Sequence, residues 1–248
     1  IHPYKDIVNC DISNYSNVES LIERFKPEYI VHLAAQAGVR LTMDKSDSYI
    51  AANITGFQNI VRSAVKNEVQ GILYASSSSV YGDASPTPYK EDSTSLRPKS
   101  IYGATKLSNE LFAEIQAKSN RIRFRGMRLF TVYGPWGRPD MALLKFTKAI
   151  DNGKSIQIFN DGKHRRDFTY IDDVTDILVK AYKKNIIKKI INICSSNPVK
   201  IKDLCSIMMK KLNKKFKINF LKRRKGEMIK TYGSNKVLRG IFQKNESF

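Results

Sequence analysis

Short apolar runs alternate along this chain with longer segments of helical character, and this alternation constrains the possible fold most strongly. The apolar runs fall at residues 28–35, 71–76, 123–130 and 190–193. The helical segments fall at residues 16–26, 46–67, about 100–118 and 173–184. Strands that alternate with helices in this way build a parallel sheet with helices on its faces. We therefore expect the fold class to be α/β, with a doubly wound parallel sheet.

One strand and the helix after it carry a pattern suited to proton transfer. The run at 71–76 leads into four serines, Ser76 to Ser79, and the helix that starts near Ser100 carries Tyr102 and Lys106. Residues four apart share a helix face, so a phenol lies beside an ammonium. A neighbouring positive charge favours the phenolate over the phenol and suits it to act as a general base. Because Tyr-x-x-x-Lys also occurs on ordinary surface helices, the serine run is what favours a catalytic interpretation.

Composition excludes some classes of protein and leaves others open. No apolar run reaches the roughly 18 residues that a membrane span needs, so we expect no membrane partner. Cys10, Cys194 and Cys205 form neither a zinc pattern nor a disulfide framework, which indicates a cytoplasmic location and no metal. The net charge of +20 is compatible with a nucleic-acid binder, but no lysine cluster forms a known motif of that kind. We therefore expect no nucleic acid as a partner.

With its flanking segments, the serine–tyrosine pattern resembles the extended short-chain dehydrogenase/reductase superfamily. Within that superfamily the chain is similar to the NAD-dependent epimerase/dehydratase family, and most similar to the UDP-glucuronate 4-epimerases. The resemblance runs from Asp11 to about Lys236. Its motifs are HLAAQAGVR (32–40), ASSSSVYG (75–82), SIYGATK (100–106), TVYGPWGRPDMA (131–142) and HRRDFTYIDD (164–173). The resemblance implies a Rossmann-like sheet and a bound NAD.

Matching the motifs residue by residue assigns a role to each position of the expected site. The implied catalytic residues are Ser77, Tyr102 and Lys106. Those implied to bind NAD are Asp11, Ile12, Leu33, Ala34, Ala35, Asn53, Tyr102, Lys106 and Phe130. Those implied to bind the UDP-sugar are Ser78, Ser79, Thr131, Arg138, Arg166, Arg224 and Glu227. Among these, Arg138 is expected to hold the substrate carboxylate, because a guanidinium binds a carboxylate bidentately.

The implied reaction is 4-epimerisation of a UDP-sugar, UDP-glucuronate to UDP-galacturonate, through a 4-keto intermediate. Related dehydratases and decarboxylases need a carboxylate near the serine run, whereas this chain has Ser78 and Ser79 there. The segment RRKGEM (223–228) is closer to the UDP-glucose 4-epimerases, so the sugar stays open between the two. The further alternatives are another sugar-nucleotide dehydratase or decarboxylase of the same superfamily, an inactive fragment and a basic nucleic-acid binder.

The first residue, Ile1, aligns just before the third strand of the family pattern. We therefore expect the first two strands and the Gly-rich phosphate loop to be absent from this chain. Residues 6–10 would then be a strand without a neighbour, residues 28–35 an exposed edge, and residues 1–27 loosely attached. We expect weak NAD binding by the isolated chain, and micromolar binding in a calorimetric titration would contradict this.

The resemblance also implies a division into domains and an assembly. The expected NAD-binding part is 1–134, with 168–194 returning to it, and the expected nucleotide-sugar part is 135–167 with 195–248. A homodimer is expected to form through the helices at about 46–67 and 100–118.

Overall fold

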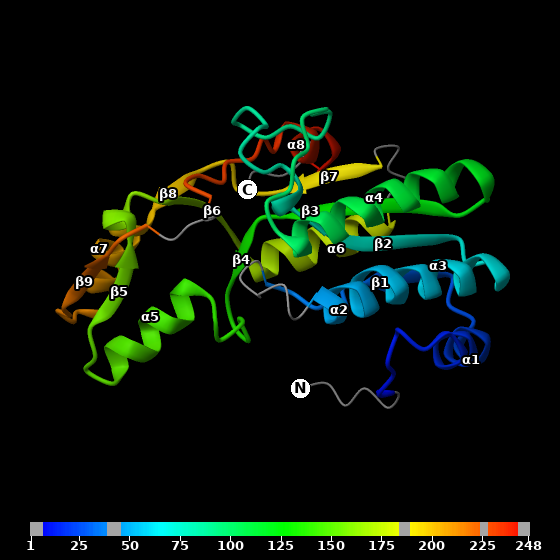
Figure 1. Ribbon diagram of the computed structural model, residues 1–248, viewed down its shortest axis with the longest axis horizontal. Coiled ribbons are helices and arrows are strands. Elements are labelled where there is room, and N and C mark those ends of the chain that lie inside the picture. The colour runs from blue at the N-terminus through cyan, green and yellow to red at the C-terminus, as the bar shows by residue number, and fades with distance from the viewer. Residues whose placement is uncertain (1–6, 39–45, 184–188, 224–227, 243–248) are drawn as a thin grey trace. The chain divides into compact units, whose positions relative to one another are not determined.

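The computed structural model describes residues 7–38, 46–183, 189–223 and 228–242 (Figure 1). The chain divides into two compact units, Ile1–Val80 with Ser100–Gly126, and Tyr81–Lys99 with Met127–Phe248. Strand β3 (Arg123–Leu129) passes from the first unit into the second.

The first unit contains a parallel pair of strands with helices before, between and after them. Its elements are α1 (Tyr15–Phe25), β1 (Tyr29–His32), α2 (Ser46–Tyr49), the π-helical turn η2 (Ile50–Thr55), α3 (Gly56–Lys66), β2 (Gly71–Ser77), the 3-10 turn η3 (Ser78–Val80) and α4 (Ile101–Ser119). β1 pairs with β2 in parallel, with Tyr29 opposite Gly71 and His32 opposite Tyr74. Every residue of β2 is buried, as its near-continuous apolar sequence predicts.

The helix boundaries of the first unit follow from local chemistry. The side chain of Asn14 caps α1 by accepting a hydrogen bond from the Asn17 amide at 3.2 Å, and Ser100 caps α4 by accepting from the Gly103 amide at 3.1 Å. Such side-chain caps satisfy amides that have no partner inside the helix. α1 ends at Lys26 in a left-handed conformation, directly before Pro27, which cannot continue a helix.

The second unit contains two small sheets and their covering helices. Its remaining elements are β4 (Thr131–Tyr133), α5 (Ala142–Asp151), β5 (Ile156–Phe159), η4 (Asn160–Gly162), β6 (Arg165–Tyr170), α6 (Ile171–Lys183), β7 (Ile190–Ile193), β8 (Pro198–Lys200), α7 (Ile201–Leu212), β9 (Ile218–Leu221) and α8 (Lys236–Phe242). One sheet has the order β4-β6-β8, and the other pairs β5 with β9 in parallel. A core that includes Phe146, Ile156, Ile158 and Met208 holds α5, β5 and α7 together.

The parallel pairs and the helices between them confirm the α/β class and most of the predicted elements. One expectation is wrong: residues 7–10 form no strand, and Ile7 is 82% exposed. A strand is stabilised by a hydrogen-bonded neighbour, and no described strand lies beside this run. The segment at 28–35 is strand only over Tyr29–His32, and β1 lies at the end of its sheet order as expected. The sheet of β4, β6 and β8 was not predicted.

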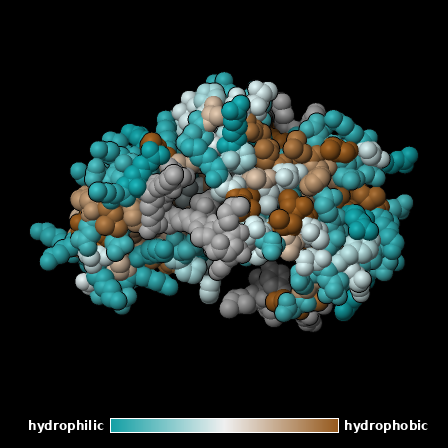
Figure 2. Space-filling model, in the orientation of Figure 1, coloured by the Kyte–Doolittle hydropathy of each residue, from teal (hydrophilic) through white to brown (hydrophobic). Residues whose placement is uncertain are grey.

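Among the described residues, no helix is long and apolar enough to cross a membrane. On the face shown in Figure 2, hydrophilic side chains cover most of the surface and hydrophobic ones form smaller patches. Cys10 is half-buried, while Cys194 and Cys205 are buried, and all three are free thiols.

Candidate functional site

Helix α4 carries the predicted tyrosine and lysine and packs against the strand that ends in the serine run. α4 packs against both β2 and η3, the two elements that carry Ser77 to Ser79, and Figure 1 shows α4 running beside β2. The Lys106 ammonium lies 5.8 Å from the centre of the Tyr102 ring. The two side chains are therefore neighbours, as their i, i+4 spacing predicts.

The serine run is held in a tight local turn. The Ser77 hydroxyl donates to the Ser79 hydroxyl at 3.2 Å, and it accepts from the Ser79 amide at the same distance. Ser77 and Ser78 are buried, whereas Ser79 is half-buried. The position of the Ser77 oxygen is thus set by the backbone of η3 as well as by its own rotamer.

Among the described residues of the first unit, Lys106 is the most deeply buried cation. It is 1% exposed, and burial lowers its pKa to about 8. Lysine is almost never fully buried without a reason, because desolvation disfavours its charged form. His32, at the end of β1, is also buried, and its pKa is lowered to about 4 by burial and, to a smaller extent, by the charge of Lys106. His32 is therefore neutral at physiological pH.

Asn53 ties the loop after β1 to helix α4. Its side-chain oxygen accepts from the Gln36 amide at 2.8 Å, and its side-chain nitrogen donates to the Gln36 carbonyl at 3.1 Å and to Thr105 Oγ1 at 3.0 Å. Asn53 is 1% exposed and lies in the π-helical turn η2. Its contacts hold the segment that contains Leu33, Ala34 and Ala35. Leu33 and Ala34 are exposed and Ala35 is half-buried, so a ligand can approach their backbone.

Asp11 and Ile12 lie on the turn that precedes α1. The Asp11 carboxylate accepts from the Ser13 amide at 2.9 Å and from the Ser13 hydroxyl at 2.8 Å, and these hydrogen bonds lower its pKa. The Ile12 carbonyl accepts from Asn59 on α3 at 3.0 Å. The described contacts of Asp11 are therefore those of a local cap, and its exposed side chain has room for a further partner.

Four of the predicted residues that the structure describes lie in the second unit. Phe130 is buried near Tyr81 and Tyr89, and Thr131 is the half-buried first residue of β4. Arg138 is exposed, and its guanidinium already holds a carboxylate: Nε donates to Asp140 Oδ1 at 3.0 Å and Nη2 to Oδ2 at 2.5 Å. Arg166 donates to the Arg165 carbonyl at 2.9 Å. Arg224 and Glu227 lie outside the described residues.

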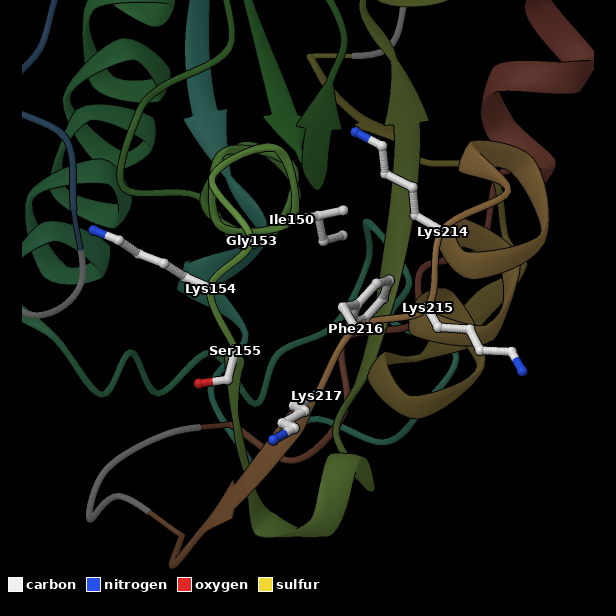
Figure 3. Close-up of a pocket in the computed structure, with 8 residues that line it drawn as sticks. All are labelled: Ile150, Gly153, Lys154, Ser155, Lys214, Lys215, Phe216 and Lys217. Carbon is white, nitrogen blue, oxygen red and sulfur yellow. The ribbon is translucent and has the colours of Figure 1, made fainter.

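A separate cavity of about 380 Å³ lies in the second unit between the ends of α5 and α7, and it contains none of the predicted site residues. Ile150 and Phe216 are among its lining residues, together with Lys154, Lys214 and Lys217. Figure 3 shows the lysine side chains spreading apart rather than converging on one point. The Lys214 ammonium is paired with Asp151 at 3.4 Å. This arrangement does not gather the positive charge that would bind a compact anion.

Sequence reasoning missed a buried hydrogen bond behind the serine run. The Ser76 hydroxyl donates to Glu110 Oε1, and both side chains are buried. Glu110 lies four residues after Lys106 on α4, so its spacing was a visible signal. It was missed because an acidic residue in a long helix is usually on a solvated face.

The chain resembles proteins of known family over most of its length. Residues 2–194 match the NAD dependent epimerase/dehydratase family. The uncharacterized protein MJ1055 of Methanocaldococcus jannaschii is 43% identical over 222 residues, covering 88% of this chain and 68% of that protein. A probable UDP-glucuronate 4-epimerase of Rhizobium meliloti is 32% identical over 253 residues, covering 94% and 74%. The structure of UDP-glucuronic acid 4-epimerase from Bacillus cereus, a complex with UDP-glucuronic acid and NAD, has a TM-score of 0.88 at 35% identity, covering 97% and 76%.

Proposed function

Because the chain belongs to the NAD dependent epimerase/dehydratase family, we propose that it inverts carbon 4 of UDP-glucuronate to give UDP-galacturonate. The observation that supports this proposal most strongly is that α4, which carries Tyr102 and Lys106, packs on β2 and η3, which carry Ser77 to Ser79. By the family resemblance, Ser78 and Ser79 occupy the positions where a dehydratase or a decarboxylase has the carboxylate that it needs. The site is therefore suited to oxidising and reducing the carbon that bears the hydroxyl, without elimination.

In the proposed mechanism, Tyr102 takes the proton of the 4-hydroxyl and Ser77 holds the sugar oxygen in place. The Lys106 ammonium, 5.8 Å from the Tyr102 ring centre, favours the phenolate form that accepts this proton. Bound beside carbon 4, NAD would supply the reversible hydride acceptor that inversion at this carbon needs. Tyr102 then gives its proton back to the 4-oxygen, so no external oxidant is consumed.

The first unit has features that fit NAD. Leu33, Ala34 and Ala35 follow β1 with accessible backbone, and Asn53 holds the loop just after them. Ligands of open α/β sheets bind at the carboxyl ends of the strands, which is where this loop and the serine run lie. We assign the cofactor to these residues together with Asp11, Ile12, Tyr102, Lys106 and Phe130.

The second unit supports the choice of a uronate. Arg138 binds the carboxylate of Asp140 bidentately. A guanidinium group in this arrangement is also suited to bind the carboxylate of a sugar. We assign the rest of the UDP-sugar to Ser78, Ser79, Thr131 and Arg166, with Arg224 and Glu227 outside the described residues. The division into an NAD-binding part and a nucleotide-sugar part is proposed with the boundaries given by the sequence.

We propose in addition that the protein is a homodimer. Helix α4 and the adjoining η2 expose apolar side chains: Ile50 is 50% exposed, Leu111 54% and Ile115 59%. A second copy of this surface would remove these side chains from water, which is favourable at roughly 25 cal/mol per Å² of apolar area.

The proposed function is tested with UDP-glucuronate, NAD and the Tyr102→Phe variant, following UDP-galacturonate by chromatography. Loss of the proton acceptor is expected to cut turnover by about 10²-fold to 10⁴-fold. Tyr182→Phe on α6, where Tyr182 is 42% exposed, is the matched control and is expected to keep full turnover. Near-normal turnover of Tyr102→Phe would refute the role of Tyr102. A preference for UDP-glucose would refute the choice of sugar but not the reaction.

A further inference from the structure

Helix α4 buries polar side chains and exposes apolar ones, which is the reverse of an ordinary surface helix. Its buried residues include Thr105, Lys106, Asn109 and Glu110. Ordinarily, the buried face of a surface helix is its apolar stripe. Lysine and glutamate are almost never fully buried unless they have a specific partner. The buried polar face of α4 therefore requires an explanation for each charged residue on it.

The proposed function accounts for Lys106 but not for Glu110. Glu110 lies one helical turn beyond Lys106 and two turns beyond Tyr102, so the three residues follow one stripe along the helix. Its side chain is 7% exposed. No step of the proposed chemistry uses a carboxylate at this position.

The partner of Glu110 lies beside the serine run. Ser76 on β2 is 1% exposed, and its hydroxyl donates to Glu110 Oε1. Ser76 directly precedes Ser77, the serine assigned to the sugar oxygen. A hydrogen bond to an ionised carboxylate is roughly twice as strong as one between neutral groups, and its loss leaves a buried hydroxyl without this partner.

We infer that Glu110 is a positioning residue that fixes α4 to the end of β2 through Ser76. This inference rests on the proposed function, because α4 and β2 carry its Tyr102, Lys106 and Ser77. Proton transfer needs its partners at hydrogen-bond distance, and a displacement of about 1 Å costs on the order of 100-fold in rate. The Glu110–Ser76 bond joins the two elements whose relative placement sets that distance.

The test compares Glu110→Ala, Ser76→Ala, their double variant and Glu110→Gln, all in the full chain. We expect Glu110→Ala and Ser76→Ala each to lower kcat about tenfold to 100-fold, with little change in KM for UDP-glucuronate. The double variant is expected to lose no more than the worse single variant, because both remove the same interaction. Glu110→Gln is expected to restore kcat, because its amide oxygen still accepts from Ser76. Glu114→Ala is the matched control, since Glu114 lies one turn further on with an exposed ion pair to Lys118 at 3.3 Å.

A second readout does not depend on activity. The titration of Tyr102 is obtained from the ultraviolet absorbance of the phenolate, as the difference between a protein and its Tyr102→Phe counterpart. Displacing Tyr102 from Lys106 in Glu110→Ala is expected to move the midpoint to higher pH, and Glu110→Gln is expected to leave it in place. If Glu110 acted only through its charge, both variants would move the midpoint to lower pH, and the inference would be overturned.

The two proposals fail in different ways. If the unmodified protein epimerises UDP-glucuronate but Glu110→Ala matches it in kcat and in the Tyr102 titration, the positioning role is wrong and the proposed function stands. If Glu110→Gln is as impaired as Glu110→Ala, the positioning role is also wrong. If the unmodified protein has no epimerase activity, the proposed function fails, and the Tyr102 titration alone still decides the role of Glu110.

Discussion

At the scale of one residue, burying the charged ammonium of Lys106 lowers the free energy of unfolding of the protein. Burial lowers its pKa from 10.5 to about 8, so at neutral pH a charged ammonium is held where desolvation opposes it. The unfolded chain binds this proton more tightly than the folded protein, so stability rises as the pH increases from about 8 to about 10.5. Below pH 8 the penalty is complete, at most about 3 kcal/mol.

We therefore predict that Lys106→Met raises the melting temperature at pH 7, and that the difference from the unmodified protein shrinks as the pH approaches 10.5. Thermal unfolding of both proteins across this range is the measurement. Lys118→Met is the control on the same helix, because Lys118 is exposed and its removal is expected to give no such trend. A difference that stays constant from pH 7 to pH 10.5 would contradict the burial of a charged Lys106.

The Arg138–Asp140 pair yields a second prediction at this scale. The hydrogen bonds and charge of Arg138 lower the pKa of Asp140, so the pair is ionised at neutral pH. Asp140 would therefore compete with the substrate carboxylate that we propose for Arg138. Asp140→Asn is expected to lower KM for UDP-glucuronate, by no more than about fivefold because exposed ion pairs are worth at most about 1 kcal/mol. Steady-state kinetics measure the change. Asp161→Asn, which removes the exposed Asp161–Lys163 pair, is expected to leave KM unchanged. A higher KM in Asp140→Asn would argue that Arg138 does not meet the sugar.

At the scale of elements, the sequence predicted best where one local rule decides the structure. β2 was predicted from its apolar run, and it is buried along its whole length. α4 was predicted to start near Ser100, and Ser100 is its cap. Residues 6–10 have strand-forming composition, yet strand structure depends on a hydrogen-bonding neighbour that local composition does not reveal. The three-residue strands β4 and β8 are too short to show a period-2 pattern.

The candidate site was predictable only in part, because local sequence patterns do not report contacts between residues that are far apart in the chain. The spacing of Tyr102 and Lys106 is local, so the sequence placed the two side chains side by side. The bond from Ser76 to Glu110 joins residues 34 apart in the chain, and no local pattern predicts it. Burial of polar groups is decided by the packing of β2 against α4, which hydrophobic periodicity does not report.

At the scale of the whole molecule, the proposed homodimer gives a prediction about assembly. Replacing both Leu111 and Ile115 by glutamate is expected to convert the dimer to a monomer, because charge would then be buried at the interface. Sedimentation velocity distinguishes the two states. Ile207→Glu on α7 is the control, since Ile207 is 51% exposed but lies on another helix. A monomeric unmodified protein, or a double variant that still dimerises, would contradict the proposed surface.

The π-helical turn η2 has a consequence for how this helix tolerates changes in length. Asn53 meets Gln36 and Thr105 from within that turn. Deleting one residue between Tyr49 and Gly56 would rotate one part of the helix against the other by about 100°. Asn53, or the helix on one side of it, would then point in a new direction. The hydrogen bonds of Asn53 with Gln36 and with Thr105 would be lost together. The number of residues in this turn is therefore constrained separately from their chemical identity, so an insertion or deletion there is more harmful than most substitutions.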